Sequence, residues 1–207
     1  MSAPPPFADD TEKDRCTWAT GEYLIPYHDT EWGVFTLDDR AHFEHLSLEG
    51  FQSGLSWTTI LKKRGHLNRL FADFDPAVVA EFTGDDIEGI LQDPGGIRNR
   101  RKVESVVNNA RRVLQIIERE GSFFGFLFDV FGGTVLVNRF TKDAEIPPHT
   151  EKSTELAKIL KKEGFSFVGP TTVYAHLQSM GFVNDHLVSC FRRSEIIDEL
   201  AVAWVEL

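Results

Sequence analysis

Signals that start helices recur along this chain, and they constrain its fold more than any other feature. Ser56 precedes one amphipathic segment, Asp75 stands directly before Pro76, and Thr83 is followed three residues later by Asp86. Ser, Thr and Asp side chains at such places accept hydrogen bonds from the free N–H groups of a helix start, and proline fits the first helical position. Because alternation with a period of two residues is scarce, the sequence predicts an all-α fold.

The expected helices run from these starts to the glycines and prolines that follow them. The earliest is expected to open at a capping box made by Thr36 and Asp39 and to continue to Gln52. The others are expected over residues 57–71, 75–82, 85–92, 99–120, 153–163, 171–180 and 194–205. Residues 122–131 are very apolar and are expected to be buried, whereas residues 132–150, with two prolines, are expected to form loops.

The composition limits the organisation of the chain and its partners. We expect residues 1–14, which are Pro-rich and acidic without an apolar signal segment, to be a disordered tail. Residues 15–192 are expected to form the helical domain, and residues 193–207 a C-terminal helical extension. No apolar run reaches the roughly 20 residues of a membrane span, so we expect a cytoplasmic protein without membrane contact. The net charge of −10 argues against binding to nucleic acid through overall charge and leaves a local basic patch as the alternative.

The two cysteines raise the question of a metal site. Cys190 follows His186 by four residues, so both side chains lie on one face if the segment is helical. Cys16 is the other cysteine, and His28 follows it by twelve residues, a spacing that no standard zinc finger uses. A closed zinc site needs four such ligands. Buried thiols and capping histidines are the alternative interpretation.

The remaining histidines of the N-terminal half offer no second metal set. His42 and His45 fall on the helix that carries Glu49, and His66 follows a Lys-Lys-Arg run. We expect these three side chains at the surface or at the rim of a pocket.

A basic turn stands out in this acidic chain. Between residues 98 and 112 one acid, Glu104, faces six basic residues: Arg98, Arg100, Arg101, Lys102, Arg111 and Arg112. Residues 94–102, with Gly95 and Gly96, are expected to join two helices as a helix-hairpin-helix, whose backbone N–H groups can hold a phosphate without reading sequence. An ordinary helical turn with a solvated basic face is the alternative.

An acidic residue lies among aromatic ones in two further segments. Glu49 interrupts an apolar helix end, Trp57 follows shortly after, and Tyr27 and Trp18 stand near the first cysteine. Aromatic rings around a carboxylate suit a flat, electron-poor ligand. A core glutamate surrounded by packing aromatics is the alternative.

Several segments in order resemble one family. They are "RCTW", "YHDTEWG", "LEGFQSGLSW", "LKKR", "FDPAVVA", "GGIRNRRKVESVVNNA" and "LKKEGFSFVGPTTVYAHLQSMGFVNDH", followed by Cys190. From about residue 15 to residue 191 the chain resembles DNA-3-methyladenine glycosylase I, a branch of the helix-hairpin-helix DNA glycosylases.

The resemblance implies one structural zinc ion per chain, held by Cys16, His28, His186 and Cys190. It also implies a base pocket in which Glu49 is catalytic and Tyr27, Trp57 and Trp18 hold the base. The hairpin residues implied to contact the DNA backbone are Gly95, Gly96, Arg98, Arg100, Arg101 and Lys102. The expected partner is double-stranded alkylated DNA, the expected product is free 3-methyladenine, and the expected state is a monomer.

The implied chemistry requires little acid catalysis, because methylation at N3 makes adenine cationic and a good leaving group. Residues 103–121 contain no Asp, which agrees with an enzyme limited to such labile bases, and no lysine stands out as a Schiff-base nucleophile for a lyase step. Two residues depart from the family pattern. Gly96 stands where an apolar residue is usual and is expected to loosen the hairpin, and Phe51 is expected to reshape the pocket.

Two other functions compete with a glycosylase. One is a non-catalytic binder of alkylated bases, and the other is a zinc-stapled helical module whose basic turn contacts a protein.

Overall fold

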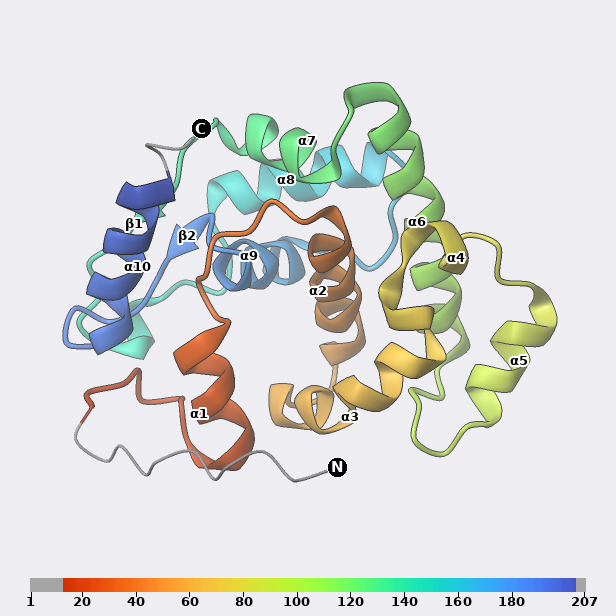
Figure 1. Cartoon of the computed structure of the whole chain (residues 1–207), viewed down its shortest axis with the longest axis horizontal. Helices are drawn as coiled ribbons and strands as arrows, with labels where there is room; N and C mark the ends of the chain where they lie inside the picture. Colours follow the sequence, from red (N-terminus) through yellow and green to blue (C-terminus); the bar gives the residue numbers. More distant parts are fainter. Residues whose placement is uncertain (1–12, 204–207) are drawn as a thin grey trace.

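The computed structural model describes residues 13–203, with side chains described to residue 201. Figure 1 shows helices packed around one another, with α1 and α10 at one end and α5 at the other. The α-helices are α1 (Gly21–Thr30), α2 (Asp39–Gln52), α3 (Trp57–Leu70), α4 (Pro76–Val79), α5 (Gly84–Gln92), α6 (Arg100–Glu120), α7 (Phe123–Phe131), α8 (Glu151–Lys162), α9 (Pro170–Ser179) and α10 (Phe191–Ala203). Two 3-10 helices, η1 (Ala72–Phe74) and η2 (Asp143–Glu145), and two short strands, β1 (Leu136–Val137) and β2 (Val183–Asn184), complete them.

The helix starts agree with most of the sequence signals. Ser56 caps α3, Asp75 caps α4 ahead of Pro76, and Thr83 forms a reciprocal capping box with Asp86 at α5. The predicted capping box at Thr36 is wrong. The cap of α2 is Asp38, whose carboxylate accepts from the N–H groups of residues 40 and 41, because it lies directly before the first helical residue.

Several elements were missed by the sequence patterns. Helix α1 contains Pro26 in its interior, and α7 falls in the apolar segment of residues 122–131. The segment expected to be loops contains β1, which pairs in parallel with β2 over two residues: Leu136 with Val183, and Val137 with Asn184. Such short pairs leave no alternation to read, so the fold is helical with one parallel bridge.

The core is built around α2, which lies near the centre of the fold (Figure 1) and buries nine of its residues. Phe51, on this helix, is buried in the main core, where its ring lies 5.5 Å from the ring of Phe71. Phe51 is not among the residues that line the cavity described below, so the structure gives no support to the expectation that it reshapes the ligand pocket.

The two ends of the described chain meet. The N–H of Phe191, at the start of α10, donates to the carbonyl of Asp14 over 2.9 Å. Gly181 makes the approach of the C-terminal part possible, because its φ is +77° and a Cβ there would lie 2.5 Å from the backbone nitrogen of Phe35. Helix α10 begins three residues before its predicted start at residue 194, and its last predicted residues lie outside the described part, as do residues 1–12 of the predicted tail.

Among residues 13–203, no helix has both the length and the apolar character needed to cross a membrane.

Candidate active site and metal cluster

A cavity of about 540 Å³ opens between α1, α2, α3 and α9. Four predicted site residues lie in its wall: Tyr27 on α1, Glu49 on α2, Trp57 at the start of α3, and Trp18. The remaining lining residues are Leu24, Trp32, Gln52, Ser56, Thr58, Asp143, Ile146, Ala175 and Gln178. Residues far apart in the sequence thus form one concave site, as the resemblance implied.

Glu49 is the buried acid of this cavity. Glu49 is 6% exposed, and no hydrogen-bond or ion-pair partner for its carboxylate occurs among residues 13–203. Burial raises the pKa of Glu49 from 4.5 to about 8. A buried carboxyl group without a partner is costly, which argues that the site is shaped for a ligand rather than for stability.

Other polar atoms of the cavity wall are also unpaired. The indole nitrogen of Trp57 and the Oδ1 atom of Asp143 are shielded from solvent without a hydrogen-bond partner in the described part of the chain. Residues with polar atoms that lack internal partners therefore line one cavity. Unpaired polar groups in a largely apolar, concave site are typical of a ligand pocket.

Aromatic rings form the apolar part of the wall. The ring of Tyr27 lies 5.4 Å from that of Trp57 and 6.4 Å from that of Trp18, measured between centroids. Trp18 in turn meets the edge of Trp32 at 5.0 Å. Burial, followed by the charge of Glu49, raises the pKa of Tyr27 well above 10, so its phenol stays neutral beside the acid.

The expectation that His42 and His45 lie at the surface or at a pocket rim is wrong. Both are buried, and a third buried histidine, His176, lies 3.2 Å from His42 between ring nitrogens. Burial lowers the pKa of His42 to about 4 and that of His45 to about 3, so both are neutral at pH 7. These rings belong to the interior beneath the cavity, where the ring of His45 stacks at 6.3 Å on that of Tyr27.

The four predicted metal ligands come together. Cys16, His28, His186 and Cys190 are buried, and their ligand atoms lie within 4.8 Å of one another. Cys190 Sγ is 3.4 Å from His28 Nε2 and 3.4 Å from His186 Nδ1, and Cys16 Sγ is 3.7 Å from His186 Nδ1. The edges of a tetrahedron of nitrogen and sulfur ligands around zinc are about 3.3–3.8 Å long. The cluster is therefore close enough and of the right chemistry to bind a metal ion.

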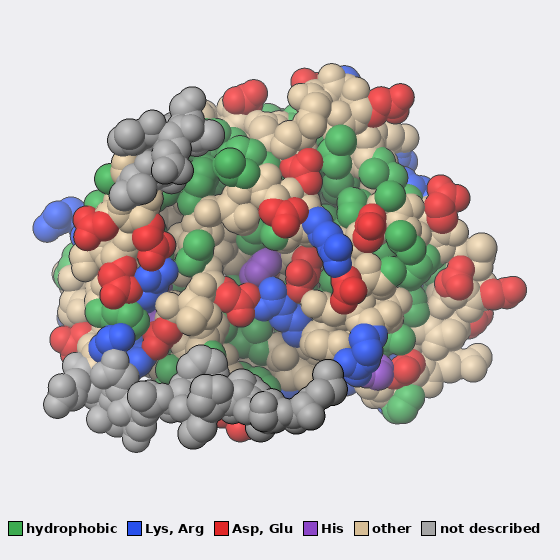
Figure 2. Space-filling model, viewed as in Figure 1, with side chains coloured by type: hydrophobic (Ala, Val, Ile, Leu, Met, Phe, Trp, Pro, Cys, Tyr) green, Lys and Arg blue, Asp and Glu red, His purple; other side chains and the backbone are tan. Residues whose placement is uncertain are grey.

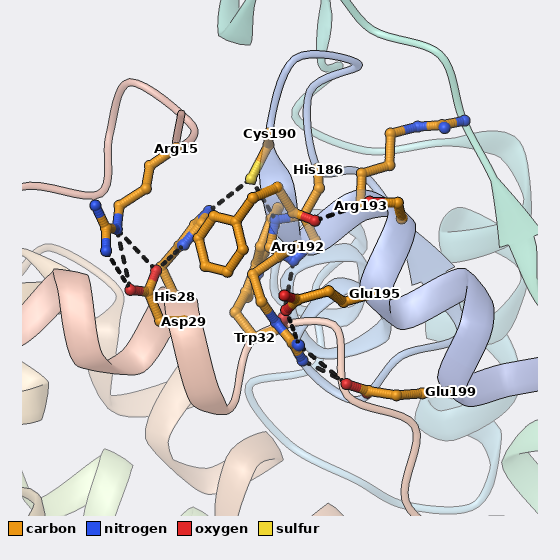
Figure 3. A network of polar contacts seen from close by, with 12 residues as sticks. Arg15, His28, Asp29, Trp32, His186, Cys190, Arg192, Arg193, Glu195 and Glu199 are labelled. Atoms are coloured by element: carbon orange, nitrogen blue, oxygen red, sulfur yellow. Dashed lines mark hydrogen bonds and ion pairs between the residues drawn. The ribbon is translucent and has the colours of Figure 1, made fainter. Parts of the chain in front are cut away.

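The groups around the cluster orient its two imidazoles (Figure 3). His28 Nδ1 lies 2.7 Å from a carboxylate oxygen of Asp29, and His186 Nε2 lies 3.0 Å from the carbonyl oxygen of Trp32. Both oxygens accept hydrogen bonds, so these nitrogens donate and the other nitrogen of each ring keeps a free lone pair toward the sulfur atoms. Partial burial would raise the pKa of Asp29, but its hydrogen bonds from Arg15 and His28 outweigh this and lower it.

The predicted hairpin is a braced turn between α5 and α6. Lys63 Nζ on α3 lies 2.9 Å from the carbonyl oxygen of Gly95 and 3.3 Å from that of Gly96. Asp93 accepts from the N–H of Gly95 and from His66, each over 2.7 Å. The ring of His66 lies so close that a Cβ on Gly95 would come within 2.6 Å of it.

The space around Gly96 in this turn is tight. It is buried, and a Cβ there would meet the side chain of Leu70 at 3.1 Å and the carbonyl oxygen of Ile90 at 3.2 Å. A side chain larger than glycine would have to displace one of these neighbours.

The basic side chains of the turn divide into two groups. Arg98 and Arg101 are exposed and have no ion-pair partner among residues 13–203, whereas Arg100 pairs with Glu88 and Glu104. Lys102 is buried, and its ammonium donates to the carbonyl oxygens of Phe51 and Ser53 over 2.7 and 2.6 Å. Lys102 therefore satisfies the C-terminal end of α2 instead of facing outward.

Beside this turn lies a second cavity of about 420 Å³. Lys63, Arg98 and Lys102 border it, together with Leu55 from the loop before α3. On the face shown in Figure 2, Lys and Arg side chains lie among acidic ones. In a chain with a net charge of −10, the basic concave surface is a local feature.

Comparison with known proteins identifies the family. The model of the family described as methyladenine glycosylase matches residues 18–193. The chain belongs to the methyladenine glycosylase family. It is 43% identical over 178 residues to DNA-3-methyladenine glycosylase 1 of Escherichia coli (strain K12), covering 86% of this chain and 95% of that protein.

Solved structures agree with this membership. A crystal structure of 3-methyladenine DNA glycosylase I, 42% identical, superposes with a TM-score of 0.84 over 86% of this chain and 98% of the other. A variant of 3-methyladenine DNA glycosylase I in complex with 3-methyladenine, 34% identical, also gives a TM-score of 0.84, over 86% and 97% of the two chains. A relative with the same fold as this chain is therefore in complex with 3-methyladenine.

Sequence reasoning missed several residues of the site in this methyladenine glycosylase. Asp143 and Ile146 come from the segment expected to be loops, and Gln178 comes from the end of α9. No motif or helical period marks Asp143 and Ile146, whereas Gln178 lies in a segment that resembles the family, without a role assigned to it. Lys63 belongs to the basic run of residues 62–64, which was expected as a second contact region, but its contacts with the turn depend on the tertiary packing of α3.

Proposed function

We propose that this chain is a monofunctional DNA glycosylase that excises 3-methyladenine from alkylated duplex DNA. The observation that carries the proposal is the buried, unpaired Glu49 in an aromatic cavity large enough for a purine. An enzyme that acts on a base must take it out of the duplex into such a pocket.

The charge of the substrate explains the role of Glu49. Adenine methylated at N3 is cationic in DNA, and a cation that enters the cavity lowers the cost of ionising the buried carboxyl group. The resulting carboxylate accepts hydrogen bonds from the base edge, while Tyr27, Trp57 and Trp18 pack on the ring. Uncharged adenine offers no such compensation, so the pocket favours the alkylated base over the normal one.

The base leaves with the electron pair of its glycosidic bond, which neutralises its positive charge, and a water molecule adds to the sugar. No amine nucleophile is needed, and among the described residues no lysine lines the cavity. The proposal therefore includes hydrolysis without a lyase step.

We infer that the metal of the Cys16–His28–His186–Cys190 cluster is a single structural zinc ion. Two thiolates and two imidazoles suit zinc, and four protein ligands leave no position for a reacting water. When bound, zinc supplies a cross-link between the ends of the domain. The ligands also fix the pocket wall, because Cys16 and His28 stand next to or near Trp18 and Tyr27 in the chain.

The DNA backbone is proposed to lie on the helix-hairpin-helix formed by α5, the turn and α6. The exposed guanidinium groups of Arg98 and Arg101 support this placement. Gly95 and Gly96 shape the turn that carries them, since their N–H groups donate to Asp93. Arg100 can join them by exchanging its carboxylate partners for phosphate. Lys102 is buried and contributes indirectly, because its ammonium holds the loop between α2 and α3 in place.

Leu55 is proposed to contact the bases of the duplex. This apolar side chain is 43% exposed, and Gly54 before it has a φ of +81°, which turns the loop sharply. It borders the basic cavity, while the next residues, Ser56 and Trp57, border the aromatic one. An apolar side chain between a phosphate-binding surface and a base pocket is placed to occupy the space left by an extracted base.

The test is a base-release assay. The protein is incubated with methylated duplex DNA, and the freed bases are separated and identified. Release of 3-methyladenine supports the proposal. Tight binding of free 3-methyladenine without release would identify a non-catalytic binder, and absence of salt-dependent DNA binding would favour a protein-interaction module.

A further inference from the structure

A second carboxylate borders the base pocket, in a segment where the sequence gave no indication of function. Asp143 is the first residue of η2, and its side chain lines the same cavity as Glu49. Its Oδ2 accepts a hydrogen bond from the hydroxyl of Thr17, while its Oδ1 is shielded from solvent and has no partner among the described residues.

The two acids lie at different depths. Glu49 is buried, whereas Asp143 is half-buried and its partner Thr17 is exposed, so Asp143 lies nearer the solvent than Glu49 does. A base extracted from DNA enters ring first and stays attached to its sugar, which remains at the opening. The carboxylate nearer the opening is therefore the one nearer the sugar.

The position of Asp143 is fixed from two sides. Thr17 follows Cys16 of the metal cluster, and Ile146 of the same segment packs against the aromatic residues of the pocket. A carboxylate held in this way needs no rearrangement to meet a positive charge, which is the condition for electrostatic stabilisation of a transition state.

The reaction moves positive charge toward this end. When the bond between C1′ and the base nitrogen breaks, both electrons go to the cationic base, which becomes neutral, and the sugar becomes an oxocarbenium-like cation. Water then bonds to C1′ and loses a proton to solvent. Positive charge thus leaves the base near Glu49 and develops at the sugar. Residues 103–121, in α6 and at its end, contain no aspartate that could stabilise this charge.

We propose that Asp143 is a catalytic residue that stabilises the sugar cation and orients the attacking water, while Glu49 recognises the base. This inference rests on the proposed glycosylase function. It assigns the two carboxylates to two stages of one reaction: Glu49 to binding and Asp143 to bond cleavage.

The experiment compares single-turnover base release from methylated duplex DNA with binding of free 3-methyladenine followed by tryptophan fluorescence. Asp143→Asn keeps the shape of the side chain and can still accept from Thr17. We expect base release to slow by about 100- to 1,000-fold, as for loss of one preorganised electrostatic group, with binding of the free base changed less than about twofold. Asp143→Glu should recover part of the rate, and the exposed Asp198→Asn serves as the matched control.

Base release at the wild-type rate by Asp143→Asn would overturn the inference. An equal loss of base release and of free-base binding would also overturn it, because Asp143 would then only shape the pocket. Failure of the wild-type protein to release any 3-methyladenine would instead contradict the proposed function, so the two failures are distinguishable.

Discussion

Lys63 Nζ lies 2.9 Å from the carbonyl oxygen of Gly95, so helix α3 holds the turn that joins α5 to α6. The ammonium also reaches the carbonyl oxygen of Gly96, and it satisfies two backbone acceptors that the tight turn leaves free. Lys63 therefore fixes the shape of the turn that carries the exposed Arg98 before DNA arrives.

Replacing Lys63 by Met should weaken DNA binding without affecting the pocket. Met keeps the length of the side chain but removes both hydrogen bonds, so we expect duplex affinity to fall by about 10-fold, in line with two charge-assisted bonds that are partly replaced by water. Binding of free 3-methyladenine should be unchanged. Fluorescence anisotropy with labelled duplex at several salt concentrations measures the effect.

The neighbouring Lys62→Met is the matched control for that experiment, because it removes the same charge from a side chain that lies over the ring of Tyr23, away from the turn. Equal losses in both variants would mean that Lys63 acts only through its charge.

Leu55→Ala should reduce base release from duplex DNA by about 10-fold, because a truncated side chain no longer fills the space of the extracted base, whose unstacking costs a few kcal/mol. Release from single-stranded DNA should be affected much less, since no stacked duplex has to be opened. Leu37→Ala is the control, as Leu37 is similarly exposed at 48% but borders neither cavity. Equal effects on both substrates would contradict the proposed role.

Glu49→Gln should lower kcat/KM for base release by about 10- to 100-fold, the range expected for loss of a charge-assisted hydrogen bond. The pH dependence is more specific. Since kcat/KM reports the free enzyme and the pKa of Glu49 is raised to about 8, the wild-type value should rise with pH up to about 8, as the carboxylate that attracts the cationic base forms. The variant should lack this rise. A wild-type profile that is flat between pH 6 and 9 would contradict the assignment.

How far this site can be predicted from the sequence depends on whether local or tertiary contacts position each residue. The four metal ligands and the pocket residues Glu49, Tyr27 and Trp57 lie in quoted motifs, and the structure brings each group together. Helix caps such as Asp75 could be predicted from the sequence, because a cap depends only on the few residues that follow it.

Other residues could not be placed because their environment is tertiary. Lys102 lies in a basic run and reads as a surface residue, yet it serves the carbonyl oxygens at the end of α2. His42 and His45 are polar side chains expected at the surface or at a pocket rim, yet α9 covers their face of α2 with His176. Asp143 belongs to an irregular segment whose path is fixed by contacts with Thr17 and the β1–β2 pair.

Glu49 should also make the stability of the protein depend on pH. Its pKa is about 8 in the folded state and 4.5 when exposed, so the folded state binds more protons between these values. The free energy of unfolding should therefore fall as pH rises from 4.5 to 8, by up to about 1.4 kcal/mol per pH unit from this residue. Urea titrations of wild type and Glu49→Gln isolate the contribution, because the buried histidines, which act in the opposite direction below pH 6.5, are common to both. A constant difference across this range would contradict the raised pKa.

Cys190→Ser should remove the metal and loosen the ends of the domain. Serine is a poor zinc ligand, so the bound zinc should fall from about one per chain to a small fraction, and the melting temperature should drop by about 10 °C if the cross-link contributes a few kcal/mol. Elemental analysis and a thermal melt measure the two effects. Val188→Ser, at an exposed position two residues earlier, is the control and should alter neither.

Since the cluster holds Cys16 next to Thr17 and Trp18, Cys190→Ser should also bind free 3-methyladenine more weakly, even at temperatures where it remains folded. Unchanged zinc content in Cys190→Ser would show that the metal, if bound, is held elsewhere.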